Sequence, residues 1–199
     1  KIVHVITDLK FGGAGRYLLE ICRYIDKERF ENIVILPKGS ILNLYIGQIQ
    51  DVRIIEINGI GGKSFDIKGV KELYHLLKNI RPDVVHTHAC FSARISATLL
   101  GVNKVLYTRH GLQAIRGGLK GFIKRFMNRI FPNKAIAVSK AVFNNLVMEG
   151  VKEEDIYLIY NGVNIPNASY NKDELRRKYG LSKDEIVITL VGRLDTIKG

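Results

Sequence analysis

The sequence predicts an α/β protein built on a doubly wound, mainly parallel Rossmann-like sheet. Seven short apolar runs alternate with stretches whose apolar residues recur at helical spacing. This alternation is typical of a parallel sheet covered by helices on both faces. Of the 199 residues, 46% are hydrophobic and 25% are charged, a composition that suits a globular domain with a sizeable core.

The first half of the chain supplies three strand–helix units. We expect a strand at 1–7, a glycine-containing loop at 8–15 and a helix at 16–26. The second unit is a strand at 32–37 with a helix at 40–50. The third is a strand at 52–57, a glycine-rich loop and a helix at 66–80, which Asp66 is expected to cap.

The second half repeats the pattern and then changes composition. Strands are expected at 83–88, 104–108, 134–138 and 156–160, the first three each followed by a helical stretch. Residues 161–171 are rich in Asn and predict a connector, with Asn161 and Gly162 shaping a hinge between domains.

An exposed helix at 172–179 and a buried strand at 185–191 come next, and a lone strand cannot bury both of its faces. The predicted organisation is therefore a first domain at 1–165, a linker and helix at 166–184, and the incomplete start of a second domain at 185–199.

Cysteine content and hydropathy favour a cytoplasmic protein. Cys22 and Cys90 are too few for a disulfide framework and lack the spacing of metal ligands, which suits a reducing compartment. No apolar run approaches the ~18 residues that a membrane-spanning helix needs.

The net charge of +12 is concentrated in one segment, because residues 111–140 hold seven Lys and Arg and no acid. Within 116–131, apolar residues at helical spacing are interleaved with Lys120, Lys124, Arg125 and Arg129. The apolar face of this helix either packs on the sheet or lies on an anionic membrane, where it would contact a lipid-linked acceptor. The second alternative predicts peripheral binding to the inner face of the plasma membrane. Nucleic-acid binding is disfavoured, since no known module or aromatic platform is present.

Polar residues follow several predicted strands, at the sheet edge where ligands of open parallel sheets bind. These cleft candidates are Gly12, Gly13, Gly15, Arg16, His86, His88, Arg109, His110 and Ser139. Ser139 is also expected to cap the helix that follows it. Together the candidates predict a polar cleft.

The glycine loop does not fit a dinucleotide-binding fingerprint. Leu18 stands where the third glycine is required, and the second strand runs into Pro37 and Gly39 without the acid that binds ribose. A dehydrogenase is therefore disfavoured. The glycines either let backbone N–H groups approach a phosphate or a sugar, or serve a tight turn.

His86 and His88 are two residues apart on a strand and should face the same way. They suggest a metal site, but no third ligand stands at usable spacing, so a position in the core or lining the cleft is the better interpretation. We expect no metal and no cofactor.

The order of motifs along the whole chain resembles that of the retaining GT-B glycosyltransferases of family four. The segment 192–199 is the most specific match, being similar to the family's G-R-L-x-x-x-K-G signature. The other matching motifs are Gly12-Gly13, Thr108-Arg109-His110-Gly111, Ala137-Val138-Ser139-Lys140 and Asn161-Gly162-Val163-Asn164. Gly15 is a departure, because many members carry Glu or Gln there and an acceptor contact would be missing.

The resemblance implies transfer of a sugar, with retention, from a UDP- or GDP-linked donor to a glycan or lipid-linked acceptor in cell-envelope polysaccharide synthesis. It places His110 beside the donor sugar as the catalytic residue. It also implies that Arg193 and Lys198, with Gly12 and Gly13, bind the donor diphosphate in place of a metal. The chain alone would be inactive, because such an active site lies between two domains.

Two alternatives stay open at the level of sequence. One is a nucleotide- or sugar-phosphate-binding module without transfer activity. The other is a basic nucleic-acid-binding domain, which would show a steep salt dependence.

Overall fold

The computed structural model describes residues 1–115, 117–131, 133–165 and 170–191, with only the backbone of Lys120. The chain divides into two compact units, Lys1–Asn161 and Gly162–Gly199. The first unit carries all of the sheet and all nine residues predicted to line a cleft.

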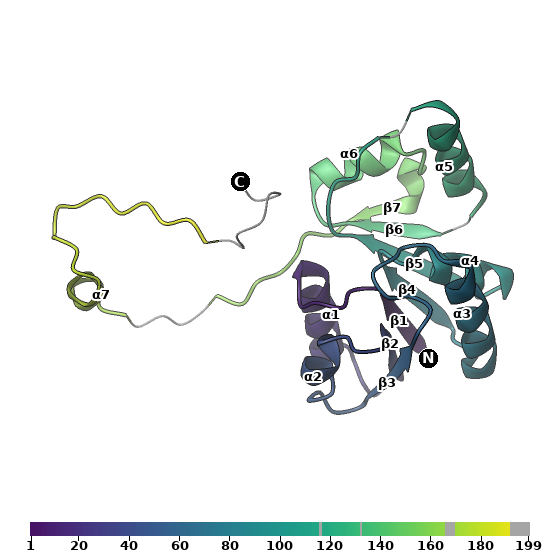
Figure 1. Cartoon of the computed structure of the whole chain (residues 1–199), viewed down its shortest axis with the longest axis horizontal. Coiled ribbons are helices and arrows are strands. Elements are labelled where there is room, and N and C mark those ends of the chain that lie inside the picture. The colour runs from purple at the N-terminus through teal and green to yellow at the C-terminus, as the bar shows by residue number, and fades with distance from the viewer. Residues whose placement is uncertain (116, 132, 166–169, 192–199) are drawn as a thin grey trace. The chain divides into compact units, whose positions relative to one another are not determined.

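The first unit is built on a parallel seven-stranded sheet with the strand order β3-β2-β1-β4-β5-β6-β7 (Figure 1). This confirms the predicted fold class. The strands are β1 (Ile2–Ile6), β2 (Asn32–Pro37), β3 (Val52–Ile57), β4 (Val84–His88), β5 (Lys104–Arg109), β6 (Lys134–Ala137) and β7 (Ile156–Leu158).

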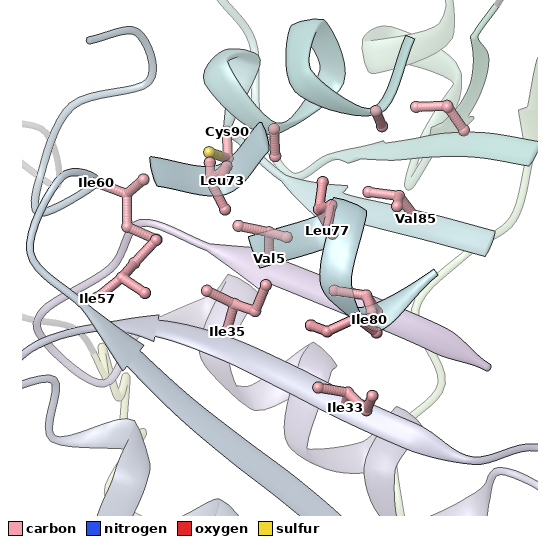
Figure 2. Close-up of a cluster of buried hydrophobic side chains, with 14 residues drawn as sticks. Val5, Ile33, Ile35, Ile57, Ile60, Leu73, Leu77, Ile80, Val85 and Cys90 are labelled. Atoms are coloured by element: carbon pink, nitrogen blue, oxygen red, sulfur yellow. The ribbon is translucent and has the colours of Figure 1, made fainter. Parts of the chain in front are cut away.

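The connecting helices divide between the two faces of the sheet (Figure 1). Helices α1 and α2 pack with Ile6, Val34 and Leu36 in one apolar cluster. Helices α3 and α4 pack on the other face with residues such as Val5 and Val85 (Figure 2). The helices of this unit are α1 (Gly13–Tyr24), α2 (Leu42–Ile46), α3 (Ile67–Ile80), α4 (Phe91–Leu99), α5 (Gly118–Ile130) and α6 (Lys140–Met148), with a 3-10 turn at Glu153–Asp155.

The predicted helix caps are confirmed, whereas two helix boundaries differ. The Asp66 carboxylate accepts hydrogen bonds from the N–H groups of Lys68 and Gly69, and the Ser139 hydroxyl accepts one from Val142. Helix α1 begins at Gly13 rather than at residue 16, so the second and third glycines belong to its first turn. Helix α2 covers only five of the eleven residues expected to be helical.

The second unit contains α7 (Lys172–Lys178), close to the predicted helix. The strand predicted at 185–191 is not formed, since residues 181–191 contain neither helix nor strand. Ile186, Ile188 and Leu190 are about nine-tenths exposed. A strand needs a neighbouring strand for its backbone N–H and C=O groups, and none of the described strands pairs with this segment. The proposed start of a second domain at residue 185 stays a prediction.

Candidate functional site

The carboxyl ends of β1 and β4 form the switch point of the sheet. These neighbouring strands lead into helices on opposite faces, α1 on one side and α4 on the other. Such a divergence opens a crevice outside the strand ends, which is where ligands of open α/β sheets bind. The loop after β1, the end of β4 and the end of β5 all reach this edge.

The glycine loop places the start of α1 at this edge. Gly12 is the residue before the helix, with extended backbone, and its carbonyl accepts a hydrogen bond from the N–H of Arg16. A Cβ on Gly12 or Gly13 would meet nothing, so the space beside this helix start is open. Gly15 differs, because a Cβ there would lie 2.5 Å from the Leu42 side chain. Gly15 is buried and allows close packing of α1 on α2, while Arg16 is exposed.

Four histidines gather on the α1 side of the sheet. His4 of β1 pairs in register with His86 of β4, and His88 lies two residues further along β4. The ring centroids of His86 and His88 are 4.3 Å apart, and His88 Nδ1 lies 3.2 Å from His110 Nε2. The ring centroids of Tyr17 from α1 and His110 are 5.0 Å apart, in an edge-to-face arrangement. The sequence predicted three of these histidines and missed His4 and Tyr17.

Burial keeps these imidazoles neutral. It lowers the pKa of His4 and that of His110 from 6.5 to about 4. The pKa of His86 and of His88 is also well below its usual value, because of burial first and then of the neighbouring histidines. A neutral His110 can donate or accept a hydrogen bond, which suits orientation of a substrate rather than proton transfer.

The histidine cluster offers one candidate set of metal ligands. The nitrogens of His4, His86 and His88 lie within 4.8 Å of one another. Three neutral imidazoles suit Zn²⁺, but His86 Nε2 is already 2.7 Å from Thr108 Oγ1. Sequence reasoning missed the third member because it comes from a strand 82 residues away. The expectation that no metal is needed stays a prediction.

Arg109 and Lys124 lie on the opposite face of this edge and share a buried carboxylate. Glu149 lies 2.8 Å from Arg109 Nη2 and 2.8 Å from Lys124 Nζ, and its side chain is only 2% exposed. Arg109 also lines a cavity beside α4 and α5, and its role towards a substrate stays a prediction. Lys124 was predicted to be part of an exposed cationic patch, but it is anchored to the protein by this ion pair.

The remaining predicted site residues lie in the connector or outside the described residues. Asn161 and Gly162 fall at the boundary between the two units, and their role as a hinge stays a prediction. The segment that carries Arg193 and Lys198 lies outside the described residues. Their binding of a donor diphosphate stays a prediction.

The apolar face of α5 is exposed, in contrast to the alternative that it packs on the sheet. Its large side chains are 50% to 74% exposed: Leu119, Phe122, Ile123, Phe126 and Ile130. Arg129 is exposed, whereas Arg125 lies against Gly150. Among the described residues no helix is both long and apolar enough to cross a membrane. An exposed apolar stripe beside basic residues fits the other alternative, a helix lying on a surface.

A comparison with protein families gives a match that agrees with the order of motifs in the sequence. The model of glycosyltransferase family 4 matches residues 11–167. The chain belongs to glycosyltransferase family 4. The match covers Gly12 and Gly13, three histidines of the cluster (His86, His88 and His110) and Arg109, whereas His4 precedes the matched range.

Known relatives show the same fold at low identity. The chain is 28% identical over 208 residues to a UDP-Gal:alpha-D-GlcNAc-diphosphoundecaprenol alpha-1,3-galactosyltransferase of Escherichia coli, with 98% of this chain and 54% of that protein covered. A glycosyltransferase from Rickettsia africae superposes with a TM-score of 0.72 at 24% identity, over 92% of this chain and 50% of that one. Anabaena HepE in complex with UDP gives 0.70 at 18% identity, over 90% and 50%. The chain thus spans about half the length of these relatives.

Proposed function

We propose that this chain is the acceptor-side half of an enzyme that transfers a sugar, with retention, from a UDP- or GDP-linked donor to a glycan or lipid-linked acceptor. The observation that carries the proposal is the family match over residues 11–167. The Escherichia coli relative is a galactosyltransferase that uses UDP-Gal as donor and alpha-D-GlcNAc-diphosphoundecaprenol as acceptor, which supports this class of donor and acceptor.

In this proposal the chain supplies the groups that position the substrates, and the predicted donor-binding domain supplies most of the contacts to the donor. The helix start at Gly12 and Gly13 presents backbone N–H groups to a diphosphate. His110, neutral and hydrogen-bonded to His88, orients the donor sugar. Arg193 and Lys198 neutralise the leaving diphosphate, where positive charge stabilises the transition state.

The first test compares this chain alone with the same chain extended by its predicted donor-binding domain. Both are incubated with a panel of UDP- and GDP-sugars, and release of nucleoside diphosphate is measured. We expect turnover only by the extended protein, because the active site is completed by the second domain. Sustained turnover by the 199-residue chain would contradict the two-domain proposal.

A second prediction concerns membrane binding through α5. Replacing Phe122 and Phe126 by Ser, or Lys120 and Arg129 by Gln, should weaken binding to anionic vesicles. Each basic residue near such a surface contributes about 1 kcal/mol, so losing two should weaken binding roughly 30-fold. Lys124 is left intact because it pairs with Glu149.

Vesicle sedimentation with and without anionic lipid measures this effect at low and at high salt. Replacing the exposed Lys68 and Lys71 of α3 by Gln removes the same charge elsewhere and serves as the matched control. Equal binding by the α5 variants and the control variant would show that α5 does not dock on membranes.

A further inference from the structure

A cavity of about 780 Å³ lies on the α4 side of the sheet edge. Strand alternation turns Thr87 and Tyr107 towards it and turns His86 and His88 to the other face. Its volume is in the range of small-ligand sites. Its lining includes Thr87, Ala89, Arg94, Tyr107, Arg109 and Lys124.

Arg94 of α4 is a buried cation in this lining without an acidic partner. It is 7% exposed, and its guanidinium carbon lies 3.9 Å from the centroid of the Tyr107 ring and 5.2 Å from that of Phe91. No carboxylate among the described residues lies within ion-pair distance of it, and its Nε has no hydrogen-bond partner there. An arginine stays protonated in proteins, and an unpaired buried charge is costly.

Two more polar atoms of the lining are buried without partners. The Thr87 hydroxyl and the Tyr107 hydroxyl make no hydrogen bond to any described residue. Buried polar groups are nearly always satisfied, so three unsatisfied donors around one cavity call for a ligand rich in acceptor oxygens. Ala89, which lines the same cavity, has a left-handed backbone with φ of 58°. A non-glycine residue in that conformation is often found at ligand sites.

The charge of the cavity is positive. Among the described residues, its lining contains three cations, Arg94, Arg109 and Lys124, and no acid. Glu149 compensates one of these charges through its pairs with Arg109 and Lys124, which leaves a net charge of two. A phosphate or diphosphate group has both the charge and the acceptor oxygens to match, and arginine binds such groups with two parallel hydrogen bonds.

We propose that this cavity binds the phosphate or diphosphate group of a phosphate-linked acceptor, an inference that rests on the proposed function. Arg94 binds the phosphoryl oxygens, and the hydroxyls of Thr87 and Tyr107 donate to them. Apolar side chains such as Phe65, Phe91 and Ile123 contact the part of the molecule attached to the phosphate. The exposed face of α5 adjoins this lining through Ile123, so a lipid chain leaving the cavity reaches an apolar surface.

Calorimetric titration of this chain with inorganic pyrophosphate, farnesyl diphosphate and farnesol tests the proposal. We expect both diphosphates to bind and farnesol to bind at least ten-fold more weakly than farnesyl diphosphate. Arg94→Gln should weaken diphosphate binding at least ten-fold, with partial recovery in Arg94→Lys. Arg53→Gln removes an exposed arginine of β3 and should change nothing.

Two further measurements test the proposal even if the Arg94 variants fail to fold. In the unaltered chain, the NMR resonance of the Arg94 Nε–H should move on addition of pyrophosphate. Tyr107→Phe, which removes one hydroxyl, should weaken binding about two- to ten-fold. A stronger affinity for farnesyl diphosphate than for pyrophosphate assigns the site to a lipid-linked phosphate, and equal affinity assigns it to a soluble one.

Absence of binding by both diphosphates overturns the proposal, as does binding that leaves the Arg94 resonance unmoved and is unaffected by Arg94→Gln. These readouts do not depend on catalysis. If the extended protein fails to transfer sugar but Arg94-dependent binding persists, the proposed function fails and the phosphate site stands.

Discussion

Acidification from pH 7 to pH 4 should remove several kcal/mol from the free energy of unfolding. The pKa of His4 is lowered from 6.5 to about 4 in the folded protein, because the ring is fully buried. The unfolded chain therefore binds the proton first as the pH falls. Stability is complete above about pH 6.5 and is lost between about pH 6.5 and pH 4. A difference of about 2.5 pKa units corresponds to about 3 kcal/mol, a large part of the 5–15 kcal/mol that typical domains have.

The other three histidines of the cluster act in the same direction, since the pKa of each is lowered by burial. Urea unfolding followed by circular dichroism from pH 7.5 to pH 4.5 measures the effect. His4→Phe keeps a ring of similar size and should flatten the pH dependence by about 3 kcal/mol. His75→Gln changes an exposed histidine of α3 and serves as the control. The same pH dependence in His4→Phe as in the unaltered protein would show that His4 is not buried in its neutral form.

Glu149→Ala should destabilise the fold by about 3–5 kcal/mol, because it leaves two partly buried cations unpaired. The side chains of Arg109 and Lys124 are 14% and 31% exposed, and Glu149 is the acidic partner of both. Glu149 directly follows α6, and its ion pair with Lys124 links the end of α6 to α5. The substitution therefore also removes this link between the two helices.

Urea denaturation of Glu149→Ala at pH 7.5 gives this value directly. Glu154→Ala is the matched control, because Glu154 pairs with Lys152 at an exposed site where ion pairs contribute 0 to about 1 kcal/mol. A loss below about 1 kcal/mol for Glu149→Ala would show that the two cations find water or another partner.

The fold and the edge that carries the site could be predicted from the sequence, because both follow from local patterns. Apolar runs bounded by polar loops fixed the seven strands, and the residue after each strand had to lie at one edge of a parallel sheet. Asp66 and Ser139 were predictable as caps, since each needs only the helix that follows it.

Features that depend on contacts between distant residues could not be predicted. His4 joins the histidine cluster only through the register between β1 and β4. Arg94 lies in an ordinary helical sequence, and nothing local shows that its guanidinium is buried on Tyr107. The exposure of Phe122 and Phe126 was unpredictable for the same reason, because periodicity defines the apolar face of α5 but does not say what covers it.

The strand expected at 185–191 shows a different limit. Its composition suits a buried strand, but a strand forms only beside another, and the described residues of the second unit, 162–165 and 170–191, contain no other strand. Local propensity is a weak guide where tertiary pairing decides the structure.

Mass spectrometry can test directly whether the enzyme transfers a sugar to a diphosphate-linked sugar acceptor. The acceptor is incubated with nucleotide-sugars and with the chain extended by its predicted donor-binding domain, and its mass is then measured. We expect an acceptor heavier by one sugar, with one nucleoside diphosphate released per transfer, in the presence of EDTA. An acceptor of unchanged mass with every UDP- and GDP-sugar tested would contradict it, and so would activity that chelation abolishes and Mg²⁺ or Mn²⁺ restores.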